Sequence, residues 1–278
     1  MQDAAEGELD RYGVPASMAF TGVVAASWKL YRSLFGRLVL LFAALQVLTV
    51  FLGEALRAIA EDRPVGLVAV LGLFFVLVGV LLGSAQVVAT CSAVVGHLNG
   101  RAVSGIEALV GLPKKKELLS AGLFLGMLAM VTASLLGQSP LSGSILWVLY
   151  GPLIVGHVIV VERVSLQEAW SRTKELSNRH VARIFLYLFC IALLIVLFEG
   201  LLGNLVLFGL FDASAKGIGV RATGDALTVL LNTLFLPYLA IAATVIYLEL
   251  RARKEGLTLE GLQNEWAATD VEGAANRD

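Results

Sequence analysis

Charged residues are scarce in this chain. Asp, Glu, Lys and Arg make up 15% of its 278 residues, whereas a soluble domain carries about 25%. Charge at this density cannot cover the surface of a soluble protein of this size, and the mean hydropathy is +0.81. The net charge of −1 gives no bulk attraction to nucleic acid. The composition predicts a protein largely covered by lipid, with no nucleic-acid partner.

Residues that carry chemistry are also few. The two cysteines, Cys91 and Cys190, both lie in apolar runs, as small core residues do. The three histidines have no metal-ligand spacing. The sequence contains no phosphate-binding loop, no nucleophile-elbow motif and no H-E-x-x-H motif. We therefore predict no metal, no cofactor and no enzymatic activity.

Long stretches without Asp, Glu, Lys or Arg dominate the chain, at residues 38–53, 64–100, 118–161 and 226–248. A helix rises 1.5 Å per residue, so about 20 residues cross a bilayer. The run at 118–161 is long enough for two crossings, and Gly137–Pro140 divides it. We predict six membrane-spanning helices, at about 35–56, 65–90, 118–136, 144–161, 184–208 and 226–248.

The remaining segments are polar. Residues 1–15 and 263–278 are predicted to be disordered tails that flank a membrane domain at 16–262. The segment from Asp212 to Asp225 is rich in glycine and mixed charge, and we expect a loop there. In the long run at 64–100, the last turns are expected to protrude or bend at Gly96–Gly100.

The pattern V-S-x-x-E-A occurs twice, at Val103–Ala108 and at Val164–Ala169. Ser followed three residues later by Glu is typical of a capping box at a helix start. The helix after Ser165 is amphipathic, and a third such helix is expected at Ala16–Arg32. We predict an all-α polytopic membrane protein with three helical hairpins, each preceded by an amphipathic interfacial helix, and the hairpins are candidates for parallel repeats.

Basic residues indicate the orientation. Seventeen of the 21 Lys and Arg residues lie in the N-terminal segment, the 97–117 and 161–183 loops, and the C-terminal segment. Cytoplasmic loops carry the excess of Lys and Arg in membrane proteins. We therefore expect a multi-pass protein of the cytoplasmic membrane, with both termini and all interfacial helices on the cytoplasmic side.

Three stretches resemble a known family. Gly22–Arg37, Val164–Leu176 and, most specifically, Tyr247–Gly256 resemble the membrane domain of glycerophosphodiester phosphodiesterase-type bacterial proteins. In the last stretch Glu249 stands where Asp is usual, and Leu248 replaces a common Tyr. The resemblance implies a six-span domain of the bacterial inner membrane. Some relatives carry a soluble phosphodiesterase barrel after this domain; about 30 residues follow the last predicted span here, so we do not transfer that activity.

Two groups of residues are candidates for a functional role. Basic residues beside the inner leaflet either only set the orientation or also hold anionic headgroups or a partner; they are Lys114, Lys115, Lys116, Arg172, Lys174, Arg179 and Arg183. Polar or kinking residues inside the spans either pack structurally or line a site for a proton, ion or solute; they are Pro152, His157, Glu199, Asn232 and Pro237.

Two functional hypotheses follow. The first is a non-catalytic membrane protein: a scaffold, an accessory subunit of a membrane complex or a lipid-organising protein, with anionic lipids, another membrane protein or a second copy as partner. The alternative is a transporter of a small or lipidic solute near the kinked fourth and sixth spans. A membrane-bound lipid enzyme is a third and weaker hypothesis, because no acid/base pair supports it.

Overall fold

The computed structural model describes residues 20–60, 64–101, 103, 152–178, 180–184, 186–191, 193–194, 197, 201, 218–258 and 260–265. Every regular element among these residues is a helix. The main ones are α2 (Phe20–Ala60), α3 (Val65–Leu98), α7 (Pro152–Glu162), α8 (Leu166–Ser177) and α10 (Ile218–Glu255). The prediction of an all-helical chain is confirmed for this part of the protein.

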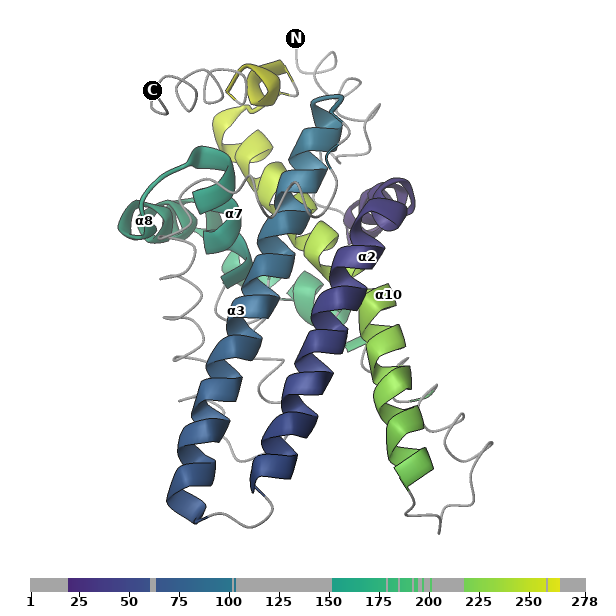
Figure 1. Ribbon diagram of the computed structural model, residues 1–278. Helices are drawn as coiled ribbons and strands as arrows, with labels where there is room; N and C mark the ends of the chain where they lie inside the picture. The colour runs from purple at the N-terminus through teal and green to yellow at the C-terminus, as the bar shows by residue number, and fades with distance from the viewer. Residues whose placement is uncertain are drawn as a thin grey trace, which may run out of the picture.

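Three of the described helices are long and apolar enough to cross a membrane, within Phe20–Leu56, Leu81–Leu98 and Val229–Glu255. They belong to α2, α3 and α10, which Figure 1 shows as three long rods. These helices are compatible with a membrane location. The predicted span at 118–136 and the first part of the one at 144–161, up to residue 151, lie outside the described residues, and 184–208 is described only in part. The count of six spans therefore stays a prediction.

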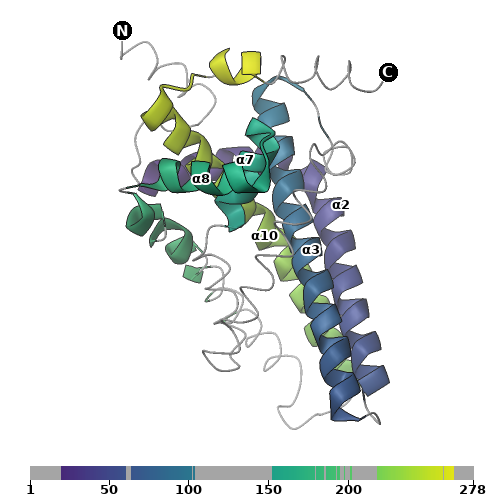
Figure 2. The ribbon, with the colours of Figure 1, turned by 90° about the vertical axis from the view of Figure 1, so that its left-hand side faces the viewer.

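Helix α2 joins two predicted elements. A surface helix up to Arg32 and a span from 35 were expected as separate units, but the 41 residues of α2 form one continuous helix. Its first turns lie across the molecule and the remaining turns descend beside α3 (Figures 1 and 2). The Ser33 hydroxyl donates to the Leu30 carbonyl, 2.8 Å away, and Gly36 follows. Helices bend at such residues without losing their hydrogen-bond ladder.

Helix α10 begins earlier than predicted. We expected a loop as far as Asp225, but the helix already starts at Ile218. Once a helix is nucleated, each added residue gains a backbone hydrogen bond, so the strong apolar helix after Ala226 extends backwards. This gain exceeds the cost of the two glycines there, about 1 kcal/mol each. At its other end α10 stops at Gly256, whose φ of +65° is typical of a helix C-terminus.

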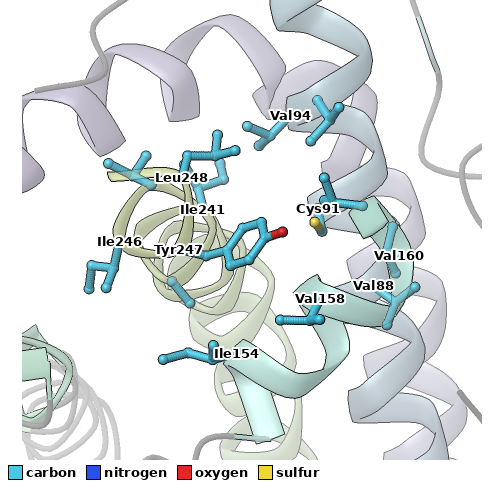
Figure 3. Close-up of a cluster of buried hydrophobic side chains, with 14 of the residues drawn as sticks. Val88, Cys91, Val94, Ile154, Val158, Val160, Ile241, Ile246, Tyr247 and Leu248 are labelled. Carbon is cyan, nitrogen blue, oxygen red and sulfur yellow. The ribbon is translucent and has the colours of Figure 1, made fainter. Parts of the chain in front are cut away.

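The hydrophobic core lies towards one end of the bundle. It combines Val88–Leu98 of α3, Ile154–Val161 of α7 and Ile241–Leu250 of α10 with a stripe of leucines on α2. Figure 3 shows Cys91, Val158 and Tyr247 meeting from three of these helices. Towards the other end, α2 and α3 expose large apolar side chains, among them Leu40, Val47, Phe51, Val70 and Phe74. This exposed apolar surface is what a lipid-covered protein presents.

Four stretches predicted to share one side of the membrane meet at the core end of the bundle. Ser33 of α2 lies 3.4 Å from His97 at the end of α3. Gln263 donates to the carbonyl of Leu98 at 3.3 Å. Arg172 of α8 is bonded to Glu255 at the end of α10. The structure therefore gathers these stretches together, while the assignment of this end to the cytoplasm stays a prediction.

Candidate functional site

Helix α8 begins with the capping box predicted for the second V-S-x-x-E-A copy. The Glu168 amide donates to Ser165 Oγ at 3.3 Å, and the Ser165 amide donates to Glu168 Oε2 at 2.9 Å. Ala169 and Leu176 are buried under the helix. Figure 2 shows α8 lying across the direction of α3, as an interfacial helix would. The first copy, at Ser104, lies outside the described residues.

Replacing Ser165 with alanine is expected to destabilise the protein by about 1 kcal/mol, because the Glu168 amide at the helix start loses its acceptor, Ser165 Oγ. Thermal unfolding of the purified protein would measure this loss. Ser171, on the exposed side of the same helix, is the matched control. Its change to alanine is expected to leave the midpoint unchanged or slightly raised, and an equal loss at both positions would contradict a capping role.

A network of charged side chains lies where α7 ends. Glu162 is its first centre, because its two carboxylate oxygens accept two hydrogen bonds and form an ion pair with a further arginine. Arg172 Nε donates to Glu162 Oε2 at 2.9 Å, and the Tyr247 hydroxyl donates to Glu162 Oε1, also at 2.9 Å. Arg251 Nε lies 3.7 Å from Glu162 Oε1. One carboxylate therefore links α7, α8 and α10.

Arg251 is the second centre of this network, and its side chain is only 6% exposed. Its Nε donates to Glu255 at 2.9 Å. Its two terminal nitrogens donate to the two oxygens of Glu265 at 3.0 and 3.1 Å. This fork-on-fork geometry is the strongest form of an Arg–carboxylate pair. Arg172 closes the network, because it is bonded to Glu175 at 3.2 Å and also to Glu255.

The basic residues predicted to contact headgroups or a partner differ in exposure and in their bonds to carboxylates within the protein. Burial acts to lower the pKa of Arg172, but the hydrogen bonds and charges of Glu162, Glu255 and Glu175 outweigh it and raise that pKa. Arg172 is thus engaged by internal carboxylates. Lys174 is exposed, with its ammonium 5.8 Å from the ring centroid of Trp170. Arg183 is exposed. Lys114, Lys115, Lys116 and Arg179 lie outside the described residues.

His157 is fully buried within the protein. Its Nε2 lies 2.9 Å from Thr244 Oγ1, and the Thr244 hydroxyl donates to the Ala240 carbonyl. Because that hydroxyl proton is already used, His157 Nε2 is assigned as the donor. The ring also lies 5.8 Å from the ring of Tyr247. The contacts favour the structural interpretation of His157.

Pro237 lies buried within α10, where it removes a backbone donor. The Tyr31 hydroxyl donates to the carbonyl of Leu234 in the same turn, at 2.9 Å. Asn232 Nδ2 lies 3.5 Å from Gln46 Oε1. These bonds tie α10 to α2 beside the proline. Pro152 is the first described residue of α7, so its role as a kink stays a prediction; Glu199 lies outside the described residues.

The chain after α10 is more ordered than predicted. Residues 260–265 are helical, so the first three residues of the predicted tail at 263–278 belong to a packed turn. Leu262 is 3% exposed within the main core. Together with the bonds of Gln263 to Leu98 and of Glu265 to Arg251, this burial holds the turn against the bundle. We call residues 260–265 the C-terminal turn.

Sequence reasoning missed most of the network, namely Glu162, Tyr247, Arg251, Glu255 and Glu265. Tyr247, Arg251 and Glu255 belong to the stretch that carried the family resemblance, but the resemblance gave them no role. The structure now shows that this stretch packs against Glu162 and the Val164–Leu176 stretch. A signal was present for Glu162, which directly follows the apolar run at 118–161.

The charges of this network fix α7, α8, α10 and the C-terminal turn to one another. Each carboxylate of the network is bonded to at least one guanidinium, which leaves no free acid/base pair in it. The described residues contain no group of three His, Cys, Asp or Glu side chains that could hold a metal ion.

Comparisons with protein-family models, curated proteins and solved structures found no match to this chain.

Proposed function

We propose that this chain is a non-catalytic integral membrane protein that acts as a scaffold, either as an accessory subunit of a membrane complex or as an organiser of lipids. The supporting observation is the network around Glu162 and Arg251. Its ion pairs and hydrogen bonds hold α7, α8, α10 and the C-terminal turn together. We further propose that the chain has six spans and that the network lies on the cytoplasmic side. The resemblance to the membrane domain of glycerophosphodiester phosphodiesterase-type proteins is part of the same proposal.

A scaffold has to present a fixed surface to its partner. The network supplies this rigidity, because a buried Arg–carboxylate pair loses several kcal/mol when one member is left alone. Outside the core the described surface is apolar along α2 and α3 and carries exposed cations at Lys174 and Arg183. Such a surface suits acyl chains, anionic headgroups and a second membrane protein.

Extraction of the native protein in mild detergent, followed by intact-mass analysis, tests this proposal. We expect the protein to carry a partner chain, a second copy of itself or bound anionic lipid. A monomer that retains neither protein nor anionic lipid would contradict a scaffold role. Turnover of a phospholipid or phosphodiester by the purified chain would contradict the non-catalytic part.

A second candidate function is transport of a small or lipidic solute beside Pro237. The favouring observation is the polar group there: Asn232 meets Gln46, and the buried hydroxyl of Thr233 has no hydrogen-bond partner among the described residues. The double change Pro237→Ala and Asn232→Leu is expected to abolish solute flux in proteoliposomes if this is a transport site. Unchanged flux would exclude the site.

A further inference from the structure

One side of the helical segment after α8 is exposed and apolar along its length. Counting from Arg183, positions 186, 190, 194, 197 and 201 follow at intervals of three or four residues, so they share one side of a helix. The four leucines among them, Leu186, Leu194, Leu197 and Leu201, are each more than half exposed, and Cys190 is partly exposed. We call these five positions the apolar stripe.

Arg183 stands on the same side of the helix as the stripe, at its upper end. Figure 2 shows the described residues of this segment below α8 and apart from α3. The stripe extends about 27 Å from Arg183 to position 201, at 1.5 Å per residue. One side of this helix therefore carries a cation followed by apolar surface over roughly the thickness of a hydrocarbon core.

Further cations gather around Arg183. Arg253 and Lys254, at the end of α10, are exposed like Arg183. Lys254 donates to the backbone carbonyl of Glu175, which brings the end of α10 against the end of α8, shortly before His180 and Arg183. Slight burial and then the positive charges of Arg183, Lys254 and Arg253 lower the pKa of His180. We call Arg183, Arg253, Lys254 and His180 the basic cluster; it joins residues about 70 positions apart in sequence.

Acidic side chains neutralise only part of this cluster. Glu249 is buried and bonded to Arg253 Nε at 2.6 Å. The carboxylates of Glu175 and Glu255 are bonded to Arg172, and Lys254 donates to the backbone carbonyl of Glu175. Among the described residues, the three exposed cations of the cluster therefore outnumber the one carboxylate bonded to them, Glu249, and the cluster keeps a net positive charge.

We propose that the basic cluster and the apolar stripe together bind one anionic phospholipid. The phosphate lies on the cluster, and an acyl chain follows the stripe downwards. Each base near an anionic headgroup contributes about 1 kcal/mol. The upper part of the stripe, about 17 Å from Arg183 to Leu194, is close to the depth of one leaflet. The inference rests on the proposed membrane location and names the lipid contact of the proposed scaffold.

Cys190 provides a probe on the stripe itself. The chain has two cysteines, and Cys91 is fully buried, so a thiol-reactive fluorophore reaches Cys190 in the folded protein. The labelled full-length protein is reconstituted in bilayers that contain brominated phosphatidylglycerol or brominated phosphatidylcholine at equal mole fraction. Bromine quenches only a fluorophore that it contacts. We expect phosphatidylglycerol to be preferred at this position by about tenfold.

The double variant Arg183→Gln and Lys254→Gln is expected to lose this preference, so that both lipids quench equally. The single variant Arg183→Gln is expected to show an intermediate preference, and its thermal midpoint verifies folding. The matched control is Lys29→Gln with Arg32→Gln, which removes the same charge from exposed positions of α2. The control is expected to keep the preference.

The outcomes separate this inference from the proposed function. Equal quenching by the two lipids in the unaltered protein, or full preference in the double variant, would overturn the headgroup site alone. No quenching by either lipid would place Cys190 outside the bilayer and would overturn the membrane location as well. Loss of the preference upon addition of free inorganic phosphate would overturn the lipid as occupant and assign the cluster to a soluble phosphate.

Discussion

Replacing Glu162 with alanine is expected to lower the free energy of unfolding by about 3–5 kcal/mol, the usual cost of breaking a buried charge pair. Glu162 is the shared acceptor for Arg172, Tyr247 and, at 3.7 Å, Arg251. Its side chain is 13% exposed, so water replaces these bonds poorly. Thermal unfolding in a fixed detergent or nanodisc would show a large drop in the midpoint.

Glu175 is the matched control for this prediction. It is a glutamate of the same network and also bonds Arg172, but its side chain is 69% exposed. Its change to alanine is expected to cost less than about 1 kcal/mol, as exposed ion pairs do. Glu162→Gln, which keeps an acceptor for the Tyr247 hydroxyl, is expected to fall between the two. Similar losses at Glu162 and Glu175 would show that the network is not a buried support.

Replacing Leu262 with alanine is expected to release the C-terminal turn while the bundle stays folded. Leu262 is buried in the core, and truncation of a buried leucine costs about 2–5 kcal/mol. Besides this burial, the structure shows the described residues of the turn bonded to the long helices through Gln263 and Glu265. Arg251 retains Glu255 and Glu162 after release, so no buried charge is left alone.

Amide hydrogen exchange would detect this release. Protection is expected to fall in residues 256–265, whereas amides of α10 near Tyr247 keep theirs. Glu260→Gln is the control, because Glu260 is an exposed acid of the same turn; it is expected to leave exchange unchanged. If Leu262→Ala instead unfolded the protein globally, the turn would be a part of the core and not a docked element.

Local features of the fold could be predicted from the sequence. The capping box at Ser165 depends on two residues three positions apart. The amphipathic helix that follows depends on a pattern of twelve consecutive residues. The apolar runs predicted α2, α3 and α10 as membrane-crossing candidates, because burial in lipid demands uninterrupted apolar helix. The boundaries were harder to predict, as the earlier start of α10 shows, because helix propagation is cooperative and continues through the two glycines there.

The network could not be predicted because its partners are far apart in sequence. Tyr247 and Glu162 are 85 positions apart, and Arg172 and Glu255 are 83 apart. In the sequence, Arg172 and Arg251 are basic residues beside predicted spans. Their position indicates the orientation of the chain in the membrane but does not identify their partners. Only the packing of α7 and α8 against α10 shows that these bases meet buried acids. The same reason hid the basic cluster, since Arg183 and Arg253 come from different segments.

The network also sets the order in which the molecule can be completed during synthesis. Glu162 and Arg172 are ten positions apart and emerge together, so their bond can form early. Arg251, Glu255 and Glu265 follow only with the last part of the chain, and proteins fold from the N-terminus as they are made. Until then Arg172 lacks one of its carboxylates and Glu162 lacks Tyr247. The residues made last therefore complete a network whose first member, Glu162, was made about 100 residues earlier. In a chain that stops before them, Glu162 and Arg172 lack part of their partners.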